Sequence, residues 1–432
     1  MPTGMRASRA DMPATLAHKI LARASGRDAV APGDIVTCRI DLLMMHDSGG
    51  PRRVAERLQK LGAQVWDPSK VIVVSDHFAP ATDLESAEIL ALTRRWSAQR
   101  GLRHYDGVGI CHVVLQEGGH VHPGMFCVGG DSHSPSGGAA GAWMVGVGAT
   151  EIAGALVTGS LWIKVPQAAR IECRGRLGAG VSAKDIMLHL CARLGMSNDA
   201  YVFEYVGSAV VALSMSERLV LCNMSAELGA ETGIVAPDQT TLDALQAAGR
   251  PFAGNIDDWQ SDDAADYALR VDVDAAALAP QIAAPHSPAN SASIETLAEN
   301  VAIDQAYIGA CTGAKLSDLR MAATVLKGRK VAAGTRLLIA PASTAMTARA
   351  AADGTLAALT AAGAILLPTG CGACAGMGAG MLAAGETGIA STARNFKGRM
   401  GSTEAKVWLG SPYTVAASAV RGRITDPREL LA

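Results

Sequence analysis

Short apolar runs that alternate with helical patterns constrain the fold of this chain more than any other feature. The runs have the length of buried strands, and each ends in small or polar residues. They are the segments 71–76 (VIVVSD), 126–131 (FCVGGD), 307–311 (YIGAC), 337–343 (LLIAPAS) and 364–370 (AILLPTG). Helical patterns lie between them, for example over residues 51–63 and 83–100. This alternation predicts α/β layers built on mostly parallel sheets.

The length of 432 residues predicts two or three domains, because single hydrophobic cores rarely grow this large. A segment rich in Pro, Ser and Ala at 280–293 is predicted to be a linker, and a softer boundary falls near 165–170. We therefore expect three domains, at residues 1–168, 169–285 and 286–432.

Charge and hydropathy exclude several classes of function. The 38 basic and 40 acidic residues nearly balance, without a dense Lys/Arg block, so we expect no nucleic-acid partner. Residues 1–12 contain Arg6 and Arg9 but no apolar core, which argues against a secretory leader and predicts a cytoplasmic protein. The most apolar stretch, 137–163, contains Glu151 and seven glycines, so it is predicted to be a buried helix and strand, not a membrane span.

The cysteines include one notable pair. Nine cysteines, an odd number, do not indicate a disulfide framework, and most are expected to be small core residues. Cys371 and Cys374 form a Cys-x-x-Cys in a glycine-rich loop, and Cys311 lies 60 residues upstream. Such a pair alone fits a redox couple, half of a zinc site or packed thiols. Zinc usually takes four ligands, and no second pair supplies them, whereas three thiolates suit an iron–sulfur cluster with one open iron.

An open iron would act as a Lewis acid on a substrate hydroxyl, which is dehydratase chemistry. The reaction also needs an acid, a base and cations for carboxylates. Asp76-His77 and Asp131-Ser132-His133 follow predicted strands, where the carboxylate can orient an imidazole. Alternatively, each Asp caps a helix or turn. His112, between apolar residues, fits a core histidine equally well.

Two arginines and a set of glycines complete the candidates. Arg394 and Arg399, in TARNFKGRMG, have the planar fork that suits a dicarboxylate, although these residues taken alone favour a solvated basic turn. Glycines on either side of the Asp131 segment leave space for the backbone to approach an anion.

Five segments together resemble the aconitase superfamily, in particular large subunits of the 3-isopropylmalate dehydratase type. GGDSHSPSGGAAGA resembles the family's DSHT-x-x-GG segment, IGACTGAK its IGSCTN motif, and GCGAC its paired-cysteine loop. ARNFKGR resembles NRNF-x-GR, and CNMSAELGA resembles NM-x-x-E. The order and separations agree over roughly residues 30–415.

The resemblance implies roles for individual residues. A 4Fe-4S cluster with one open iron would be held by Cys311, Cys371 and Cys374. The acid side would comprise Asp76, His77, Asp131 and His133, with His112 and Glu227 as a second His/carboxylate pair. Substrate contacts are implied for His46, Ser132, Asn223, Arg394 and Arg399. The expected architecture is three α/β/α-type domains around this site: the Asp/His pairs in the first, Asn223 and Glu227 in the second, the cysteines in the third.

Two positions depart from the family pattern. Gly313 stands where the family usually has Asn after Cys-Thr, and Ala393 stands where it has Asn before Arg-Asn-Phe. Both amides would lie close to the cluster, where outer hydrogen bonds tune a metal site.

The resemblance also implies a partner, because the residues after Arg399 are too few for the family's swivelling domain with its catalytic serine base. We expect a separate small subunit and a hydroxy-acid substrate. Isopropylmalate is the first candidate, and 2-methylmalate (citraconate), maleate or homoaconitate hydration is the alternative. A non-catalytic binding or regulatory homologue is the alternative of another class. We also expect the three motif cysteines to converge while the other six stay apart.

Overall fold

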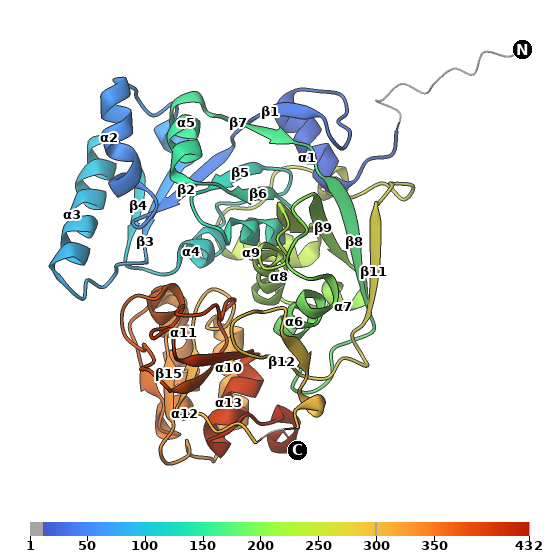
Figure 1. The fold of residues 1–432 in the computed structure, drawn as a ribbon. Coiled ribbons are helices and arrows are strands. Elements are labelled where there is room, and N and C mark those ends of the chain that lie inside the picture. The colour runs from blue at the N-terminus through green and yellow to red at the C-terminus, as the bar shows by residue number, and fades with distance from the viewer. Residues whose placement is uncertain (1–11, 299, 432) are drawn as a thin grey trace, which may run out of the picture.

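The computed structural model describes residues 12–298 and 300–431. Residues 1–11, on which the expectation of no secretory leader rests, lie outside the described part. The described residues form three sheets of four or more strands, with helices packed around them. The C-terminal part of the chain forms a lobe of its own, below the N-terminal and middle parts in the view of Figure 1. The predicted α/β class with mostly parallel sheets is confirmed.

The first sheet has five parallel strands in the order β4-β3-β2-β5-β6. They are β2 (Leu42–His46), β3 (Val71–Ser75), β4 (Arg103–Asp106), β5 (Phe126–Gly129) and β6 (Trp143–Gly146). The central strands β2 and β3 are buried along their whole length, because alternate residues enter different cores on the two faces. Met45 packs on one face with Val54 and Ile152, and Met44 packs on the other face with Val114.

Helices cover both faces of this sheet. They are α1 (Leu16–Ser25), α2 (Pro51–Leu61), α3 (Leu84–Gln99), α4 (Cys111–Glu117) and α5 (Ala149–Thr158), with the short 3₁₀ turns η2 (Pro68–Lys70) and η3 (Ser134–Ala140). The antiparallel ribbon of β1 (Ile35–Arg39) and β7 (Ser160–Lys164) closes the region. The apolar stretch 137–163 thus forms part of η3, β6, α5 and most of β7. Among the described residues, no helix is both long and apolar enough to cross a membrane.

The second sheet has four parallel strands in the order β10-β9-β8-β11. They are β8 (Gln167–Arg174), β9 (Tyr201–Val206), β10 (Thr232–Val235) and β11 (Leu269–Asp274). The accompanying helices are α6 (Ala183–Leu194), α7 (Ser208–Val211), α8 (Met215–Asn223) and α9 (Gln239–Ala247), with η4 (Met224–Ala226) and η5 (Ile256–Trp259). Helix α6 begins with a capping box between Ser182 and Asp185, which fixes its first turn.

The third sheet has the order β13-β12-β18-β17-β14-β15-β16 and is parallel from β18 to β16. Its strands are β12 (Gln281–Ala283), β13 (Ser291–Ser293), β14 (Gln305–Ile308), β15 (Arg336–Ile339), β16 (Ile365–Leu366), β17 (Thr387–Ala390) and β18 (Lys406–Gly410). The helical segments are α10 (Leu316–Leu326), α11 (Thr344–Ala352), α12 (Thr355–Ala361), α13 (Pro412–Arg421), η6 (Ile294–Thr296), η7 (Gly372–Ala375) and η8 (Pro427–Leu430).

The predicted linker at 280–293 is wrong. Strands β12 and β13 form an antiparallel hairpin there, and β12 continues the ladder onto β18. Pro285 and Pro288 fall in the connection between the two strands, where a missing backbone N–H does not interrupt the ladder. The segment is therefore part of the third sheet, and the division at 285/286 would cut through the hairpin. The three-domain division itself stays a prediction.

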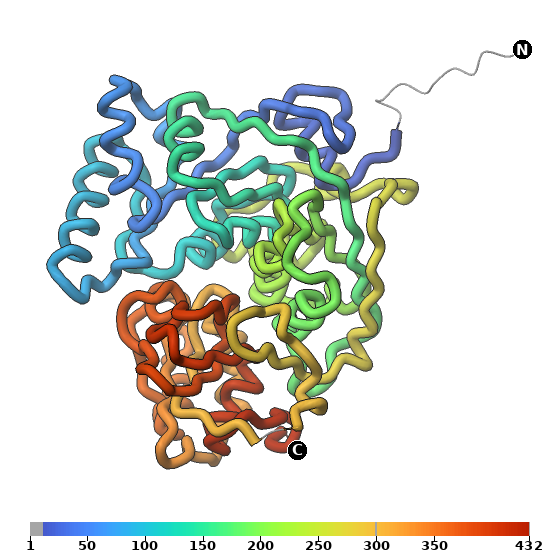
Figure 2. The backbone as a smooth tube through the Cα atoms, in the orientation of Figure 1, coloured from blue at the N-terminus to red at the C-terminus, as the bar shows by residue number. Residues whose placement is uncertain are grey.

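Each of the three large sheets, together with its helices, forms one region of the molecule. The three regions meet where the first and third sheets present the carboxyl ends of their strands. The tube in Figure 2 shows the C-terminal part of the chain lying against both earlier parts. One direct link is the backbone hydrogen bond from Ile110 N–H, just before α4, to the carbonyl of Ala342, just after β15 (2.9 Å). Ligands of α/β proteins bind outside the carboxyl ends of strands, so we expect a binding site at this junction.

Candidate active site

Asp76 and His77 follow β3 and form the first imidazole–carboxylate pair. His77 Nδ1–H donates to Asp76 Oδ1 at 2.7 Å, and Asp76 Oδ2 accepts the N–H of Cys111 at 2.7 Å, at the first residue of α4. Asp76 therefore fits both interpretations of the sequence at once, because it orients an imidazole and also accepts a free N–H at a helix start. The geometry leaves Nε2 of His77 facing the junction.

Two histidine rings stack at this junction but differ in charge. His46, at the end of β2, stacks on His77 with ring centroids 4.1 Å apart. Burial lowers the pKa of His77, but the charges of Asp76, Asp131 and Asp47 outweigh it and raise that pKa to about 9. Burial and the neighbouring charge of His77 lower the pKa of His46 to about 4. Near neutral pH, His77 therefore carries a proton on both nitrogens while His46 is neutral.

Asp131, just after β5, lies at the centre of the histidines. Its Oδ1 is 2.8 Å from Nε2 of His112 and accepts the backbone N–H of His133 at 2.7 Å. Its Oδ2 lies 3.8 Å from Nε2 of His46 and 3.9 Å from Nε2 of His77. Burial opposes ionisation, but the hydrogen bond and charge of His112 hold the pKa of Asp131 well below its usual range. Asp131 is therefore a permanent carboxylate that faces the proton of His77.

The pairing predicted for the remaining histidines is wrong. His112 pairs with Asp131, while Glu227 pairs with His133, whose Nε2 lies 2.9 Å from Glu227 Oε1. The reason is where each element ends: His112 stands in the first turn of α4 beside the end of β5, whereas Glu227 follows η4 and approaches His133 from the second region. Both histidines are thus held by carboxylates, through exchanged partners.

Arg394 connects this network to the C-terminal lobe. Its Nε donates to both oxygens of Glu227, at 2.8 and 3.0 Å, and its Nη1 donates to Ser132 Oγ at 2.8 Å. No described residue accepts a hydrogen bond from Nη2, so part of the guanidinium fork remains available. Arg394 is therefore a fixed cation beside a serine hydroxyl, not a solvated basic turn.

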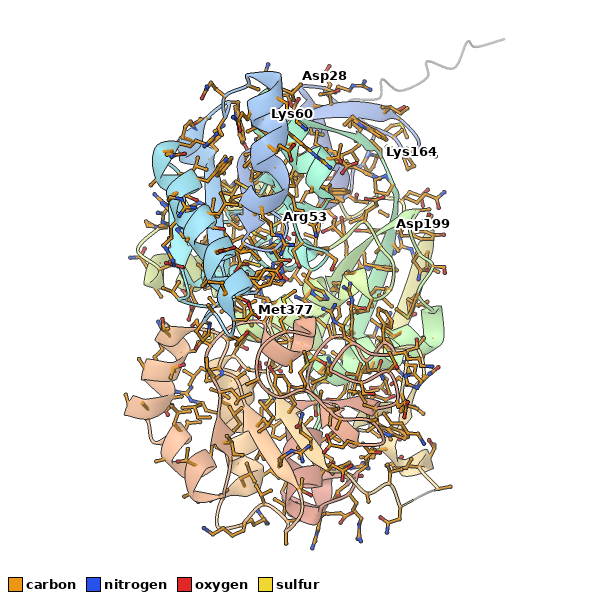
Figure 3. The ribbon with its side chains drawn as sticks, turned by 60° about the vertical axis from the view of Figure 1, so that its left-hand side comes forward. Asp28, Arg53, Lys60, Lys164, Asp199 and Met377 are labelled. Atoms are coloured by element: carbon orange, nitrogen blue, oxygen red, sulfur yellow. The ribbon has the colours of Figure 1, made fainter. Side chains whose placement is uncertain are left out.

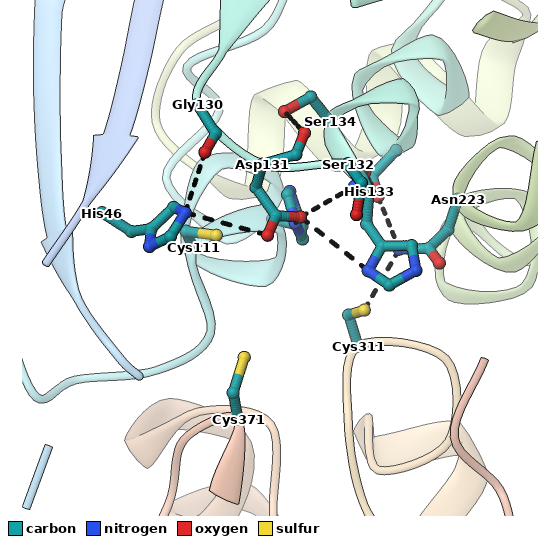
Figure 4. Close-up of polar contacts among 12 residues, drawn as sticks. His46, Cys111, Gly130, Asp131, Ser132, His133, Ser134, Asn223, Cys311 and Cys371 are labelled. Carbon is teal, nitrogen blue, oxygen red and sulfur yellow. Dashed lines mark hydrogen bonds and ion pairs between the residues drawn. The ribbon is translucent and has the colours of Figure 1, made fainter. Parts of the chain in front are cut away.

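The three motif cysteines come together opposite Asp131. Cys311 follows β14, directly after Ala310, whose φ of 68° is left-handed, and Cys371 immediately precedes η7, which contains Cys374. Figure 4 shows the sulfurs of Cys311 and Cys371 facing the same space below Asp131 and His133. After burial, the charge of Cys374 contributes to raising the pKa of both Cys311 and Cys371. The three thiols thus share one environment.

The sulfur arrangement does not suit a single tetrahedral metal ion. Sulfur ligands about 2.3 Å from one zinc would stand about 3.8 Å apart. Among the described residues, the groups whose ligand atoms all lie within 4.8 Å of one another are His46, Asp47, Asp76 and His77, and His112, Asp131 and His133; the cysteines are in neither. In each of these two groups a histidine is hydrogen-bonded to a carboxylate, His77 to Asp76 and His112 to Asp131. This is the pattern of a proton-transfer network, not of a metal site.

Five of the other six cysteines are buried in hydrophobic cores: Cys38, Cys127, Cys173, Cys191 and Cys222. Cys111 is the exception to the expected separation. It lies in the same close-up as Cys371 (Figure 4), and burial, then the charges of Asp76, Asp131 and Cys371, raise its pKa well above the usual value. A fourth thiol therefore borders the site.

The sequence matches the aconitase family (aconitate hydratase) over residues 18–422. The chain belongs to the aconitase family. It is 44% identical to a 3-isopropylmalate dehydratase large subunit 1 of Methanopyrus kandleri, over 96% of this chain and 99% of that protein. It is also 44% identical to a 3-isopropylmalate dehydratase large subunit of Herpetosiphon aurantiacus (96% and 97%), and 39% identical to a probable methanogen homoaconitase large subunit of Methanothermobacter thermautotrophicus (96% and 97%). Membership makes this chain a hydro-lyase, as the sequence predicted.

The residues around the cysteines fit the iron–sulfur cluster that the aconitase family implies. Buried polar atoms are rarely left without a partner, yet Tyr307 Oη, Arg399 Nε and Asn223 Oδ1 have none among the described residues. Asn223 at the end of α8 donates from Nδ2 to Cys311 Sγ at 3.1 Å and to Ser136 Oγ at 2.8 Å. Arg399 contributes a hydrogen bond and a charge that lower the pKa of Cys374 against the larger effect of burial. Two of these unpaired atoms, Tyr307 Oη and Arg399 Nε, are donors, and donors beside three thiols match a sulfur-rich, negatively charged group.

Three buried residues of the site escaped the sequence analysis. Asp47 accepts the backbone N–H groups of His77 (3.1 Å) and Phe78 (2.9 Å), and so fixes the loop after β3. Lys184, in α6, donates to the carbonyls of Thr392 (2.5 Å) and Ser391 (3.4 Å), two residues before Arg394.

Lys315 likewise holds backbone in place, in the loop after β14 that carries Cys311. It donates to the carbonyl of Cys311 at 3.0 Å and to Asp318 at 2.6 Å. Of the three, only Asp47 had a signal in the sequence, its place next to His46. Lys184 lies inside a helical pattern and Lys315 is the residue just before α10, and neither position indicates a buried ammonium until the tertiary structure is known.

The two departures from the family pattern both lie near Ser391, which packs against Gly313 and precedes Ala393 by two residues. A Cβ on Gly313 would stand 2.0 Å from Ser391 Oγ and 2.6 Å from the Ser391 carbonyl, so no side chain fits there. Ser391 Oγ instead bridges the cysteine loop, where it accepts the N–H of Gly309 at 3.1 Å and reaches the carbonyl of Gly313 at 3.3 Å. Ala393, two residues on, is buried. The cysteine loop is thus braced from β17 by Ser391.

A cavity of about 340 Å³ opens beside the site. It lies between the loop after β3, including His77, and the glycine-rich loop around the cysteine pair, with Tyr307 on its wall. Met377, another lining residue, lies at the junction of the C-terminal lobe with the rest of the molecule (Figure 3). The cavity therefore connects the surface with the edge of the histidine network.

Proposed function

We propose that this chain is the large subunit of an iron–sulfur dehydratase that interconverts 2-hydroxy and 3-hydroxy acids, with 3-isopropylmalate as its substrate. One observation carries the proposal: three thiols, of which Cys311 and Cys374 are buried and Cys371 is partly exposed, converge opposite a protonated imidazole, His77, across a space bordered by Asp131 and Arg394. The names of the relatives support the choice of substrate, and the homoaconitase-type relative supports a longer tricarboxylate as the second candidate.

Cys311, Cys371 and Cys374 would hold a 4Fe-4S cluster whose open iron supplies a Lewis acid for the substrate hydroxyl. His77 holds a proton at Nε2, fixed from behind by Asp76, and would deliver it to the departing hydroxyl. Arg394 and Ser132 would bind a substrate carboxylate, because Arg394 Nη1 holds Ser132 Oγ beside it while the hydroxyl proton of Ser132 and Nη2 of Arg394 stay available to donate. His112 and His133 keep their orientation through Asp131 and Glu227.

The base that removes the carbon-bound proton is the missing element. Each carboxylate of the network is already engaged by an imidazole or a backbone N–H. We propose that a separate small subunit carries the swivelling domain with the base, as the large-subunit names of the relatives suggest. We expect both subunits to work in the cytoplasm, in keeping with nine unpaired cysteines.

The test is anaerobic reconstitution of the purified chain with iron and sulfide, followed by addition of the cognate small subunit. Iron and acid-labile sulfide content is measured first, and then dehydration of 3-isopropylmalate, homocitrate, 2-methylmalate and malate. We expect cluster binding without the partner but turnover only with it. A cluster-loaded chain that works at an ordinary rate alone would place the base within this sequence.

The same experiment separates the alternatives. A chain that binds no iron yet has full activity with its partner would be a cluster-free hydro-lyase. A chain that binds neither iron nor substrate would be a non-catalytic homologue. Preference for homocitrate over 3-isopropylmalate would assign the second candidate substrate.

A further inference from the structure

Tyr307 is a buried tyrosine whose hydroxyl has no partner among the described residues. The residue lies in β14, four positions before Cys311, and its side chain is 1% exposed. Leaving a buried hydroxyl unpaired costs about 1–3 kcal/mol, so a position like this requires an explanation. The ring itself packs in the core that the second and third regions share, which accounts for its burial but not for its hydroxyl.

The surroundings show where the hydroxyl points. A Cβ on Gly309 would lie 2.1 Å from Cε1 of Tyr307 and 2.6 Å from its Oη, so the ring folds over a position that only glycine can occupy. The Oη also lies 3.4 Å from where a Cβ on Gly372 would stand. Gly372 is the residue between Cys371 and Ala373 in the paired-cysteine loop. The hydroxyl is therefore directed at that loop.

The charges around Tyr307 agree with this direction. Burial, and after it the charges of Cys374 and Cys371, raise the pKa of Tyr307 above its usual value. The hydroxyl thus stays protonated and is a donor toward any negative group on the loop. The other two polar groups beside the cysteines already have such a relation, because Asn223 donates to Cys311 and Arg399 lowers the pKa of Cys374. The polar contact of the Cys371 sulfur is instead a carboxylate, Asp76 Oδ2 at 3.9 Å.

We propose that Tyr307 is a positioning residue that donates a hydrogen bond from Oη to a cysteine sulfur of the Cys371–Cys374 loop when the cluster is bound. The inference rests on the cluster of the proposed function. Hydrogen bonds to the sulfur ligands stabilise the more negative, reduced state of an iron–sulfur cluster and so raise its reduction potential. Tyr307 thereby sets the potential of the cluster and the charge on its thiolates.

The test compares two tyrosine hydroxyls in the reconstituted full-length chain. Tyr307→Phe removes the proposed donor and keeps the ring. Tyr205→Phe is the matched control, because Tyr205 is equally buried in the same core but its hydroxyl already bonds Ser225 Oγ at 2.7 Å. The readout is the midpoint potential of the cluster, followed by electron paramagnetic resonance. We expect Tyr307→Phe to shift the midpoint to a more negative value, and Tyr205→Phe to leave it unchanged.

A second measurement compares the unmodified protein with the same variant. In the unmodified protein, exchange into D₂O should shift the Fe–S(Cys) stretching bands in the resonance Raman spectrum, since the tyrosine proton is exchangeable. In Tyr307→Phe that shift should shrink. Unchanged potential and unchanged deuterium shift in Tyr307→Phe would overturn the inference. If Tyr307→Phe takes up no cluster, the absence of any deuterium shift in the unmodified protein overturns the inference. Failure of the unmodified chain to bind any cluster would instead overturn the proposed function.

Discussion

The two sides of the site are built differently. On the histidine side, the first sheet and Glu227 pair three imidazoles with carboxylates at 2.7–2.9 Å, and Nδ1 of His112 is the buried nitrogen there without a partner among the described residues. On the cysteine side, buried donors and acceptors such as Tyr307 Oη and Arg399 Nε remain unpaired among the described residues. Proteins rarely leave buried polar groups without hydrogen-bond partners. The difference therefore indicates that folding supplies most partners on the histidine side, whereas a bound ligand supplies the missing ones on the cysteine side.

The charges follow the same division. The histidine network holds Asp131 ionised and His77 protonated, so its working protonation states are present as soon as the chain folds. Burial instead raises the pKa of all three motif thiols, to about 12 for Cys311, which keeps them neutral without a metal. Ligand cysteines must lose their protons on binding, so cluster assembly releases protons and should depend on pH.

The largest effect should come from breaking the cysteine side. Cys371→Ser should abolish cluster binding and reduce activity with the small subunit to background, since the loop would lose one of its ligands. Iron content and the visible absorbance of the anaerobic protein measure this. Cys38→Ala is the control, because Cys38 lies in β1 within a separate core. Equal loss of iron in both variants would contradict the assignment of the ligands.

Breaking the histidine side should spare the cluster. Asp131→Asn keeps the shape of the side chain but removes the charge that faces His46, His77 and His112. We expect turnover to fall by about 10²- to 10⁴-fold, the usual range for losing general acid–base catalysis, while iron content stays normal. Bleaching of Asp131→Asn would show instead that the two sides do not act separately.

How far the sequence predicted each side depends on how local the determinants are. Apolar runs located the parallel strands, but β3, β5, β14 and β15 end one to four residues before the predicted ends, because the residues that follow leave the ladder to form the site. The motif residues Asp76, Asp131 and Cys311 were found because each directly follows such a run. What was missed depends on tertiary packing: the exchange of partners between His112 and His133, the buried ammonium of Lys184, and the hairpin formed by 280–293.

A milder change tests the connection between the sides. Arg394 bonds Glu227 and Ser132 through different nitrogens of one planar group, a geometry that a lysine ammonium does not reproduce. Arg394→Lys should raise the KM for the hydroxy acid by about 10- to 100-fold, from loss of charged hydrogen bonds. Steady-state kinetics of the two-subunit enzyme measure it, with Lys397→Arg, on the same loop, as the control. An unchanged KM would remove Arg394 from the substrate site.

The raised pKa of His77 predicts a dependence on pH that belongs to the histidine side alone. Folding raises the pKa of His77 from about 6.5 to about 9, so the folded protein binds this proton more tightly than the unfolded chain. The protonated imidazole therefore stabilises the fold fully below about pH 6.5, and this stability is lost as pH rises through 9. Activity should fall over the same upper limb, where the acid loses its proton. Denaturant titrations between pH 6 and 10 should show less of this slope in His77→Gln. A parallel slope in both proteins would assign it to other groups.

The smallest expected effect concerns the brace behind the cysteine loop. A methyl group on Gly313 would meet Ser391 Oγ at 2.0 Å and its carbonyl at 2.6 Å, so the backbone of β17 or of the loop must shift. Overpacking of this kind costs about 1–3 kcal/mol, and Gly313→Ala should lower the free energy of unfolding by that amount. Gly154→Ala is the control of opposite sign, because Gly154 lies inside α5 with nothing within 4 Å of its Cβ position, and alanine there should stabilise by about 0.5–1 kcal/mol. Chemical denaturation of the cluster-free chain measures both.

Because Ser391 contacts the loop that carries Cys311, Gly313→Ala should also slow cluster uptake while leaving the pH dependence of His77 unchanged. Equal stability of the two variants would mean that Ser391 moves aside freely and that the cysteine loop is not braced from β17.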